Sequence, residues 1–355
     1  MHRSIRSAAL GLGLLASSLA FAANPLHVDL VPVSGKAAHA LGAVRISMTN
    51  TSGEAVRVLK YQTPFFGVEA DLFDVSLGKD DVEYVGMLAK RGIPSADDFM
   101  TFAAGERRSA VVELAKFYEF GTSGQYAIRY DTVLQGAAVG NAPIEKRAGV
   151  PERLQSPPIA LWVDGADIYV DPATEPSFGL GVKVGGPTPA FVKCTVDQQS
   201  QLHTALESAR GYSEGSKNYM NAGQATARYT TWFGAYTAGR FATVDSHFEQ
   251  IDSALDLQTM TFDCGCKKSY YAYVYPSQPY RIYFCRAFWS APNTGTDSRA
   301  GTIIHEVSHF DVVANTDDVV YGQAGAKNLA ISDPDGAVRN ADSHEYHAEN
   351  TPVLQ

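Results

Sequence analysis

The chain has 355 residues, of which 45% are hydrophobic and 19% are charged. This length suggests two domains, and the composition is typical of a globular protein and excludes long disordered stretches. The net charge of −9, with no basic stripe along the sequence, argues against a nucleic-acid-binding protein.

Residues 1–22 have the pattern of a secretory signal peptide. Arg3 and Arg6 give a basic start, residues 8–19 form a short apolar run, and residues 20–22 read Ala-Phe-Ala, a small-x-small cleavage pattern. A membrane anchor is the alternative, but the apolar run is too short to span a bilayer comfortably. We therefore expect a secreted, soluble protein with no membrane partner.

Residues 23–165 contain short runs in which apolar and polar side chains alternate, separated by turn residues. Examples are LHVDLVPV, AVRISMTN, AVRVLKY, SAVVELAKF, YAIRYDTVL and PIALWV. Their spacing predicts an all-β domain, an antiparallel sandwich of the immunoglobulin-like type. Residues 166–190 are rich in Gly, Pro and Ala and predict a linker, with an ordered loop wrapped over one domain as the alternative.

Residues 191–355 have a different character. Apolar spacing predicts helices over residues 195–220, 241–258 and 302–314, and residues 270–289 predict a β-hairpin with Pro276 and Pro279 near its turn. We expect a mainly helical α+β domain of the zincin type, so that the whole chain is a multidomain protein with an all-β first half.

All four cysteines lie in this second half, at Cys194, Cys264, Cys266 and Cys285. An even number in an exported chain predicts two disulfides, and three pairings are possible. A zinc site is the less favoured alternative, because Cys264 and Cys266 lack the two-residue spacer of a zinc knuckle.

The motif His305-Glu306-Val307-Ser308-His309 places two histidines on one face of a helix. Two imidazoles so placed can bind one zinc ion. Glu306 lies ~100° around the helix, where it can reach a water held by the metal and accept its proton. Two ordinary helix histidines beside an unrelated glutamate are the alternative, but export and the apolar helix favour a zinc hydrolase.

A third metal ligand must come from another part of the chain. Position 315, where a metzincin has histidine, is Asn315, so that class is excluded. A turn at Asn315-Thr316 could return a carboxylate to the metal, whereas a glutamate on a later helix would make the protein a gluzincin. The candidates are Asp311, Asp317, Asp318, Glu345 and Glu349.

The run HEVSHFDVVANTDDVVYGQ resembles the signature of the aspzincins, the family of deuterolysins and peptidyl-Lys metalloendopeptidases. In that family HExxH is followed by GTxxD, whose aspartate is the third zinc ligand. Aligned on Thr316, that aspartate corresponds to Asp318, and Asn315 replaces the usual glycine. The resemblance implies one zinc ion per chain, held by His305, His309 and Asp318.

The resemblance extends over roughly residues 191–355 and implies further roles. It implies that Tyr321 donates a hydrogen bond to the oxyanion, as a phenol near a tetrahedral intermediate can. It also implies one particular disulfide pairing, Cys194–Cys264 and Cys266–Cys285.

The segment Asn340-Ala341-Asp342-Ser343-His344-Glu345-Tyr346 resembles the part of the peptidyl-Lys branch that forms the S1′ pocket. There, carboxylates at the positions of Asp342 and Glu345 bind a lysine ammonium, which implies cleavage on the amino side of lysine. Buried together without a cation, the two would repel each other. Alternatively, Asp342 caps the last helix and Glu345 completes a capping box. His344 and His347 are interpreted as supporting or surface groups.

An exported endopeptidase endangers its own cell, so we expect a zymogen whose β-domain is an inhibitory propeptide. A basic residue of that domain could occupy a lysine pocket, and Lys90 or Arg91, between predicted strands, are the candidates; a solvated loop is the alternative, and Lys79 is a weaker candidate. Self-cleavage in the linker before Lys183 or Lys193 would then release the enzyme.

The expected partners are lysine-containing protein or peptide substrates and the chain's own propeptide, for a monomer that binds neither nucleic acid nor membrane. Two other functions stay open. One is a gluzincin with a glutamate ligand, and the other is a secreted β-sandwich binding protein with an inactive peptidase-like domain. The intact HExxH motif, Asp318 and Tyr321 argue against the second.

Overall fold

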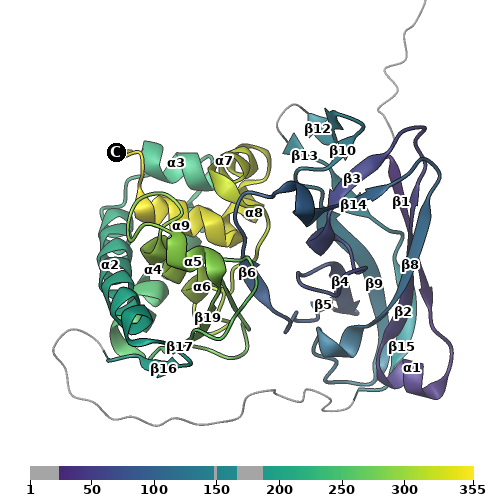
Figure 1. Cartoon of the computed structure of the whole chain (residues 1–355), viewed down its shortest axis with the longest axis horizontal. Helices are drawn as coiled ribbons and strands as arrows, with labels where there is room; N and C mark the ends of the chain where they lie inside the picture. Colours follow the sequence, from purple (N-terminus) through teal and green to yellow (C-terminus); the bar gives the residue numbers. More distant parts are fainter. Residues whose placement is uncertain (1–23, 148–149, 166–186) are drawn as a thin grey trace, which may run out of the picture.

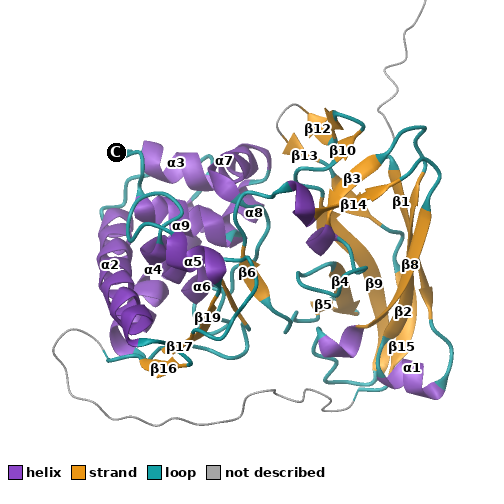
Figure 2. Cartoon of the chain, in the orientation of Figure 1, coloured by secondary structure: helices purple, strands orange, loops and turns teal. Residues whose placement is uncertain are grey.

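The computed structural model describes residues 24–147, 150–165 and 187–355, so the predicted signal peptide and most of the predicted linker lie outside the described residues. A β-rich N-terminal region (24–165) and a mainly helical C-terminal region (187–355) lie side by side (Figures 1 and 2). This coarse division confirms the prediction from the sequence. None of the described helices is long and apolar enough to cross a membrane.

The N-terminal region consists mainly of strands. They are β1 (Leu26–Pro32), β2 (Ala43–Asn50), β3 (Val56–Leu59), β4 (Phe73–Leu77), β5 (Asp80–Asp81), β6 (Leu88–Lys90), β7 (Phe99–Phe102), β8 (Arg107–Glu113), β9 (Gly124–Val133), β10 (Ala138–Val139), β11 (Ala142–Pro143), β12 (Glu145–Arg147), β13 (Val150–Pro151), β14 (Arg153–Gln155) and β15 (Ile159–Val163). The described residues of this region also form the short α-helix α1 (Lys36–Ala40) and the 3-10 helices η1 (Lys60–Gln62), η2 (Ala96–Asp98) and η3 (Leu114–Lys116). The larger antiparallel sheets have the orders β1-β2-β8, β11-β10-β3-β7 and β14-β9-β4-β5, and β15 also pairs with β9.

Alternation of side chains explains why these runs form strands. In β1, Val28 and Leu30 are buried, and they lie opposite Met48 and Ile46 of β2, which are buried as well. Successive side chains of a strand point to opposite faces, so one face of the pair enters the core. The six strand-like runs recognised in the sequence overlap β1, β2, β3, β8, β9 and β15, and two of them continue into short 3-10 helices, Lys60–Gln62 and Leu114–Lys116.

The C-terminal region is formed by helices around one sheet. Its elements are β16 (Ala190–Val192), α2 (Val196–Asn221), α3 (Ala227–Phe233), α4 (Ala238–Leu257), β17 (Thr261–Asp263), β18 (Ala272–Val274), β19 (Arg281–Phe284), α5 (Arg286–Ser290), α6 (Arg299–Ser308), α7 (Gly322–Ser332), α8 (Pro334–Arg339) and α9 (Ala341–Glu349). The sheet order is β16-β17-β19-β18-β6. Its edge strand β6 comes from the N-terminal region, and in Figure 1 it lies in dark blue beside the green elements.

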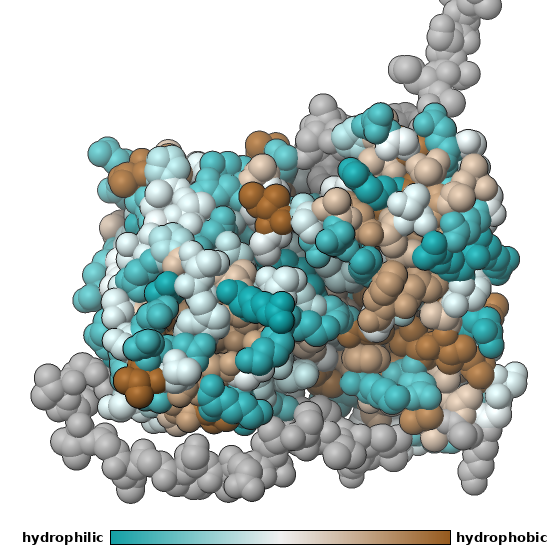
Figure 3. All heavy atoms as spheres, viewed as in Figure 1, coloured by the Kyte–Doolittle hydropathy of each residue, from teal (hydrophilic) through white to brown (hydrophobic). Residues whose placement is uncertain are grey.

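Local signals start the helices, and apolar packing fixes them. Thr195 and Gln198 form a capping box at the start of α2, which satisfies backbone N–H groups that lack helical partners. Leu202 of α2, Phe248 of α4 and Ile304 of α6 are fully buried in one core. On the face shown in Figure 3, hydrophilic and hydrophobic residues are interspersed over both regions, as is usual for a protein surface.

The predicted β-hairpin is confirmed, because β18 and β19 are antiparallel, with Tyr273 opposite Tyr283. Both disulfides form in the pairing that the family resemblance implies, Cys194–Cys264 and Cys266–Cys285. The second spans 19 residues that include β18, so it restrains the edge of the sheet against which β6 lies.

The helix predicted over residues 302–314 has different ends in the structure. It begins earlier, at Arg299, where Ser298 caps it, and it ends at Ser308. It stops because the chain folds back and the backbone N–H of Thr316 donates to the Ser308 carbonyl, at 3.1 Å. Asn315 makes this return possible with a left-handed backbone, φ +45°, which asparagine tolerates better than most residues.

Candidate active site

Helix α6 carries both histidines of the HExxH motif. His305 lies in its last turn and His309 is its C-cap residue. The centroids of their rings are 4.8 Å apart, and the ring planes are almost perpendicular, with an interplanar angle of 86°. Both side chains are fully buried, so their ring nitrogens face protein groups and not bulk water.

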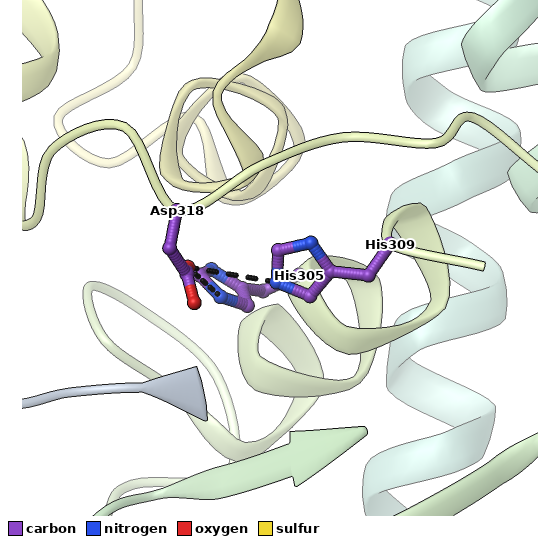
Figure 4. A group of neighbouring side chains, drawn as sticks. All are labelled: His305, His309 and Asp318. Carbon is purple, nitrogen blue, oxygen red and sulfur yellow. Dashed lines mark ion pairs between the residues drawn. The ribbon is translucent and has the colours of Figure 1, made fainter. Parts of the chain in front are cut away.

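The turn after α6 brings Asp318 to these rings. Its Oδ1 atom is 3.1 Å from His305 Nε2 and 3.5 Å from His309 Nε2, as Figure 4 shows. The opposite nitrogen of His309 is hydrogen-bonded to the Thr316 carbonyl oxygen, at 2.7 Å, and that of His305 lies 2.9 Å from the Asp342 carboxylate, within ion-pair distance. A carbonyl oxygen only accepts, so His309 Nδ1 carries a proton, and the negative charge beside His305 Nδ1 favours a proton there as well. Both Nε2 atoms are left facing Asp318.

These three side chains, here called the metal group (His305, His309 and Asp318), fit a zinc ion. Their ligand atoms lie within 4.8 Å of one another. The two Nε2 atoms and Asp318 Oδ1 are buried and lack any other hydrogen-bond partner. Unsatisfied buried polar atoms are costly, and two imidazoles with one carboxylate are a usual zinc ligand set.

The other carboxylates considered from the sequence have other partners. Among the described residues, no group that joins both histidines contains Glu345, and Glu349 accepts hydrogen bonds from Ser298. Asp317 pairs with Arg339, and burial together with the neighbouring Glu83 carboxyl raises the pKa of Asp311 to about 7. The geometry therefore disfavours a glutamate as third ligand.

Glu306 lies beside the metal group and is fully buried. Burial raises the pKa of its carboxyl group to about 7, because the charged form is poorly solvated there. Its Oε2 atom lacks a hydrogen-bond partner, and Oε1 accepts the Lys90 backbone N–H at 3.3 Å. A carboxylate with a pKa near neutrality is suited to move protons.

A second cluster, here called the carboxylate pocket (Asp297, Asp342 and Glu345), surrounds the side chain of Lys90. The ammonium Nζ is 2.6 Å from Glu345 Oε2, 3.3 Å from Asp297 Oδ1 and 3.7 Å from Asp342 Oδ1. The lysine is 0% exposed. Burial alone would lower the pKa of Lys90, but the three carboxylates hold it well above its ordinary value.

Helix α9 and the loop before α6 position this pocket. Asn340 is the N-cap of α9, and its side chain also accepts the backbone N–H groups of Val319 and Val320, at 3.1 Å each. This holds the loop that carries Asp318 against α9. Because Asn340 holds the N-cap position, the alternative that Asp342 caps α9 is wrong. The Asp342 carboxylate instead accepts the N–H of Gly322, the first residue of α7, at 2.6 Å.

Strand β6 crosses the site in extended form. It pairs with β18, with Ala89 opposite Tyr273 and Leu88 opposite Val274. The Ala89 N–H donates to Asp318 Oδ2 at 2.7 Å, and the Lys90 carbonyl accepts the Tyr271 N–H at 3.0 Å. Thus a segment of the N-terminal region covers the metal group and fills the carboxylate pocket.

The neighbouring residue, Arg91, stays outside the carboxylate pocket. Its guanidinium lies between the rings of Tyr61 and Tyr270, 4.2 and 4.3 Å from their centroids, and donates to the Glu69 carbonyl at 2.8 Å. Glu69 also pairs with Lys268, at 3.1 Å, and accepts the Tyr270 hydroxyl. Arg91 therefore belongs to a network that joins the two regions, whereas Lys79 is exposed.

Tyr321 is also covered by the N-terminal region. It is the N-cap residue of α7 and is buried. Gln135 accepts its backbone N–H at 2.9 Å and donates to its carbonyl at 2.6 Å. The ring of Tyr61 meets the Tyr321 ring edge-on, at 5.8 Å. Burial, with the nearby Asp318 charge, raises the pKa of Tyr321 well above its ordinary value.

Sequence reasoning missed several residues of the site, among them Asp297, Gln135 and Glu69. None belongs to a motif, and their partners are far away in the sequence. Asp297 is the nearest to a local signal, because it precedes the helix-capping Ser298. His344 and His347 are not surface groups: both are fully buried, and His344 contacts His247 at 2.9 Å.

Comparison with known proteins identifies the class of this site. The aspzincin family profile, described as "Lysine-specific metallo-endopeptidase", matches residues 218–349. An "Extracellular protease" of Aeromonas hydrophila is 42% identical over 360 residues, which cover 99% of each chain. A site of two histidines, an aspartate and an adjacent glutamate on this chain is thus that of a zinc metalloendopeptidase.

Two fungal relatives are similar over different lengths. A "Peptidyl-Lys metalloendopeptidase" of Grifola frondosa is 36% identical over 326 residues, 89% of this chain and 82% of the relative. One of Pleurotus ostreatus is 51% identical over 166 residues, 46% of this chain and 98% of the relative. The chain belongs to the aspzincin family of metallopeptidases and is a peptide hydrolase that uses one zinc ion.

Proposed function

We propose that this chain is the exported precursor of an endopeptidase that cleaves peptide bonds on the amino side of lysine. The observation that carries this proposal is the placement of Lys90. Its ammonium fills the buried carboxylate pocket while its backbone nitrogen lies 3.3 Å from Glu306. Two relatives named for peptidyl-Lys cleavage and one named as an extracellular protease support it.

In this proposal His305, His309 and Asp318 hold the zinc ion. When bound, zinc supplies a Lewis acid that polarises a carbonyl and acidifies water. Glu306 accepts the proton of the attacking water and delivers it to the leaving amine, and its contact with the Lys90 N–H marks where that nitrogen lies. Tyr321 donates a hydrogen bond from its phenol to the developing oxyanion, once removal of the N-terminal region has taken Tyr61 and Gln135 away from it.

The carboxylate pocket selects lysine by charge and shape. Asp342 and Glu345 are completely buried, and ionised carboxylates confined together without a cation destabilise each other. A lysine ammonium relieves this repulsion and can approach all three carboxylates, as Lys90 does. The planar, forked guanidinium of arginine does not match an arrangement around one point charge.

We further propose that the chain is a zymogen. Residues 1–22 serve as signal peptide, residues 23–165 as an inhibitory propeptide with an immunoglobulin-like sandwich, residues 166–190 as linker and residues 191–355 as catalytic domain. Lys90 occupies the carboxylate pocket and Arg91 secures the segment against Tyr270. A segment so placed excludes any other peptide from β18 and from Glu306.

Activation requires a cut between the two regions, before Lys183 or Lys193. Lys183 lies outside the described residues. Lys193 directly follows β16, which pairs in parallel with β17 in the catalytic sheet. A cut before Lys193 would remove β16 from that sheet, whereas a cut before Lys183 retains it, so Lys183 is the favoured site.

Digestion of a defined protein by the processed enzyme, with product termini identified by mass spectrometry, tests the specificity. We expect products that begin with lysine, and a Glu306→Gln protein that binds zinc, cleaves nothing and accumulates at full length. Products without enrichment of amino-terminal lysine refute the specificity, and normal turnover by Glu306→Gln refutes the mechanism. Zinc binding retained in Asp318→Ala but lost in Glu345→Ala would favour the gluzincin alternative.

A further inference from the structure

Two carboxylate oxygens are shared between the carboxylate pocket and the metal group. Asp342 Oδ1 is 2.9 Å from His305 Nδ1 and 3.7 Å from Lys90 Nζ. Glu345 Oε2 is 3.3 Å from the same ring nitrogen and 2.6 Å from the same ammonium. The His305 imidazole, which belongs to the metal group, and the Lys90 ammonium therefore contact the same two oxygens, Asp342 Oδ1 and Glu345 Oε2.

Burial makes this sharing strong. The side chains of His305, Lys90, Asp342 and Glu345 are all at most 1% exposed, so water screens little of the interaction among them. Helices α6 and α9 pack against each other and fix the imidazole and the carboxylates from separate elements. A change of charge in the carboxylate pocket therefore changes the electrostatic potential at the His305 ring, because little solvent is present to screen it.

The direction of the effect follows from the charge beside His305 Nδ1. Oxygens of Asp342 and Glu345 lie 2.9 and 3.3 Å from this nitrogen, and negative charge there makes the ring a stronger electron donor through Nε2. An ammonium at the same oxygens draws their negative charge toward itself. His305 then becomes a weaker donor to whatever cation lies at Nε2.

We propose that Asp342 and Glu345 couple the charge in the carboxylate pocket to the strength with which His305 binds zinc. This inference rests on the proposed function, since it takes the carboxylate pocket as the site of the substrate lysine. Coupling is reciprocal: a lysine in the pocket weakens the His305–zinc bond, and bound zinc weakens the hold on lysine. A weaker donor leaves zinc a stronger Lewis acid, so a lysine substrate promotes the reaction as well as its own binding.

The full-length chain already contains the required occupant, because Lys90 fills the pocket. We would measure zinc affinity by chelator competition in the Glu306→Gln protein, which does not process itself in the proposed mechanism. Lys90→Met removes the ammonium and keeps most of the stem, and it should bind zinc on the order of tenfold more tightly, within the usual range of couplings between sites. Lys90→Arg keeps a cation that fits the pocket less well, so its zinc affinity should lie between those of Lys90→Met and the parent.

Two further variants separate the coupling from simpler effects. Lys79→Met removes an equal charge at an exposed position of the same region, and it should leave zinc affinity unchanged. Asp342→Asn removes one shared carboxylate, so the difference between Lys90 and Met at position 90 should fall severalfold in that background. Direct repulsion between ammonium and zinc would instead leave that difference intact.

A second readout does not depend on affinity. The Nδ1–H proton of His305 in the zinc-loaded protein should shift further downfield in its NMR spectrum when Lys90 is replaced by Met, because its carboxylate acceptor regains negative charge. Lys79→Met should leave that resonance in place.

Several results would overturn the coupling. These are equal or weaker zinc binding by Lys90→Met, equal tightening by Lys90→Arg, or an undiminished difference in the Asp342→Asn background. Failure of the proposed function looks different: zinc binding would then be absent, or unchanged by His305→Ala.

Discussion

Replacing Lys90 by methionine should activate the full-length precursor before any cut in the linker. The substitution keeps an unbranched apolar stem and removes an ammonium that has carboxylate oxygens at 2.6, 3.3 and 3.7 Å. Removing one partner of a buried ion pair costs about 3–5 kcal/mol. The Asp297 side chain is 37% exposed, so we take the lower end, about 3 kcal/mol, which shifts the docking equilibrium on the order of 100-fold.

The assay is the initial rate at which full-length protein hydrolyses a short fluorogenic peptide with one lysine. Lys183→Arg and Lys193→Arg in both proteins keep the linker intact during the measurement. We expect a rate on the order of 100-fold above the parent. Lys79→Met, at an exposed position, is the matched control and should stay latent. A folded Lys90→Met protein as latent as its parent would refute the view that the pocket contact holds the segment in place.

Three other predictions follow from the site. In the processed enzyme, Asp342→Asn with Glu345→Gln should reduce kcat/KM for lysine peptides by at least about 100-fold, the scale of a lost buried charge pair, and peptides with norleucine in place of lysine should lose far less. Burial, reinforced by Glu345, raises the pKa of Glu349 from 4.5 to about 8, so the unfolded chain loses this proton first, and stability should fall as pH rises from about 5 to 8. Denaturant unfolding at several pH values measures this dependence of the unfolding free energy on pH. Glu349→Gln should reduce its slope by on the order of 1 kcal/mol per pH unit, whereas Glu214→Gln, at an exposed position, should not change it. Removing zinc with a chelator should lower the melting temperature by several degrees, because ligand binding adds RT ln(1 + [L]/Kd) to stability; an unchanged melting temperature would contradict the fit of zinc to the metal group.

The structure also separates two ways in which the N-terminal region covers the site. Lys90 fills the carboxylate pocket, while Gln135 and Tyr61 contact Tyr321 from different elements. These contacts are independent in the sequence and meet only at the site. Loss of one should therefore leave the other in place, which is why the assay compares rates and does not expect full activity from one substitution.

What the sequence by itself determined is local. The strands of the N-terminal half follow from alternation of side chains along each run, and β1 and β2 bury the residues that this alternation selects. His305 and His309 share a helix face because they are four residues apart. Asn315 signals the left-handed turn through which the chain returns toward α6. Each of these features depends on neighbours within a few positions.

Only the tertiary structure decided which distant groups meet. Lys90 contacts Glu306 and Asp297, which are 216 and 207 positions away in the sequence. Asp297 belongs to no sequence motif that would have predicted its role. Sequence patterns left the third ligand open between an aspartate after the turn and a glutamate on α9. Packing of α9 against α6 placed Asp342 and Glu345 on the Nδ1 side of His305 and left the Nε2 side to Asp318. No local period encodes such a choice, because it depends on which faces of separate elements are buried against one another.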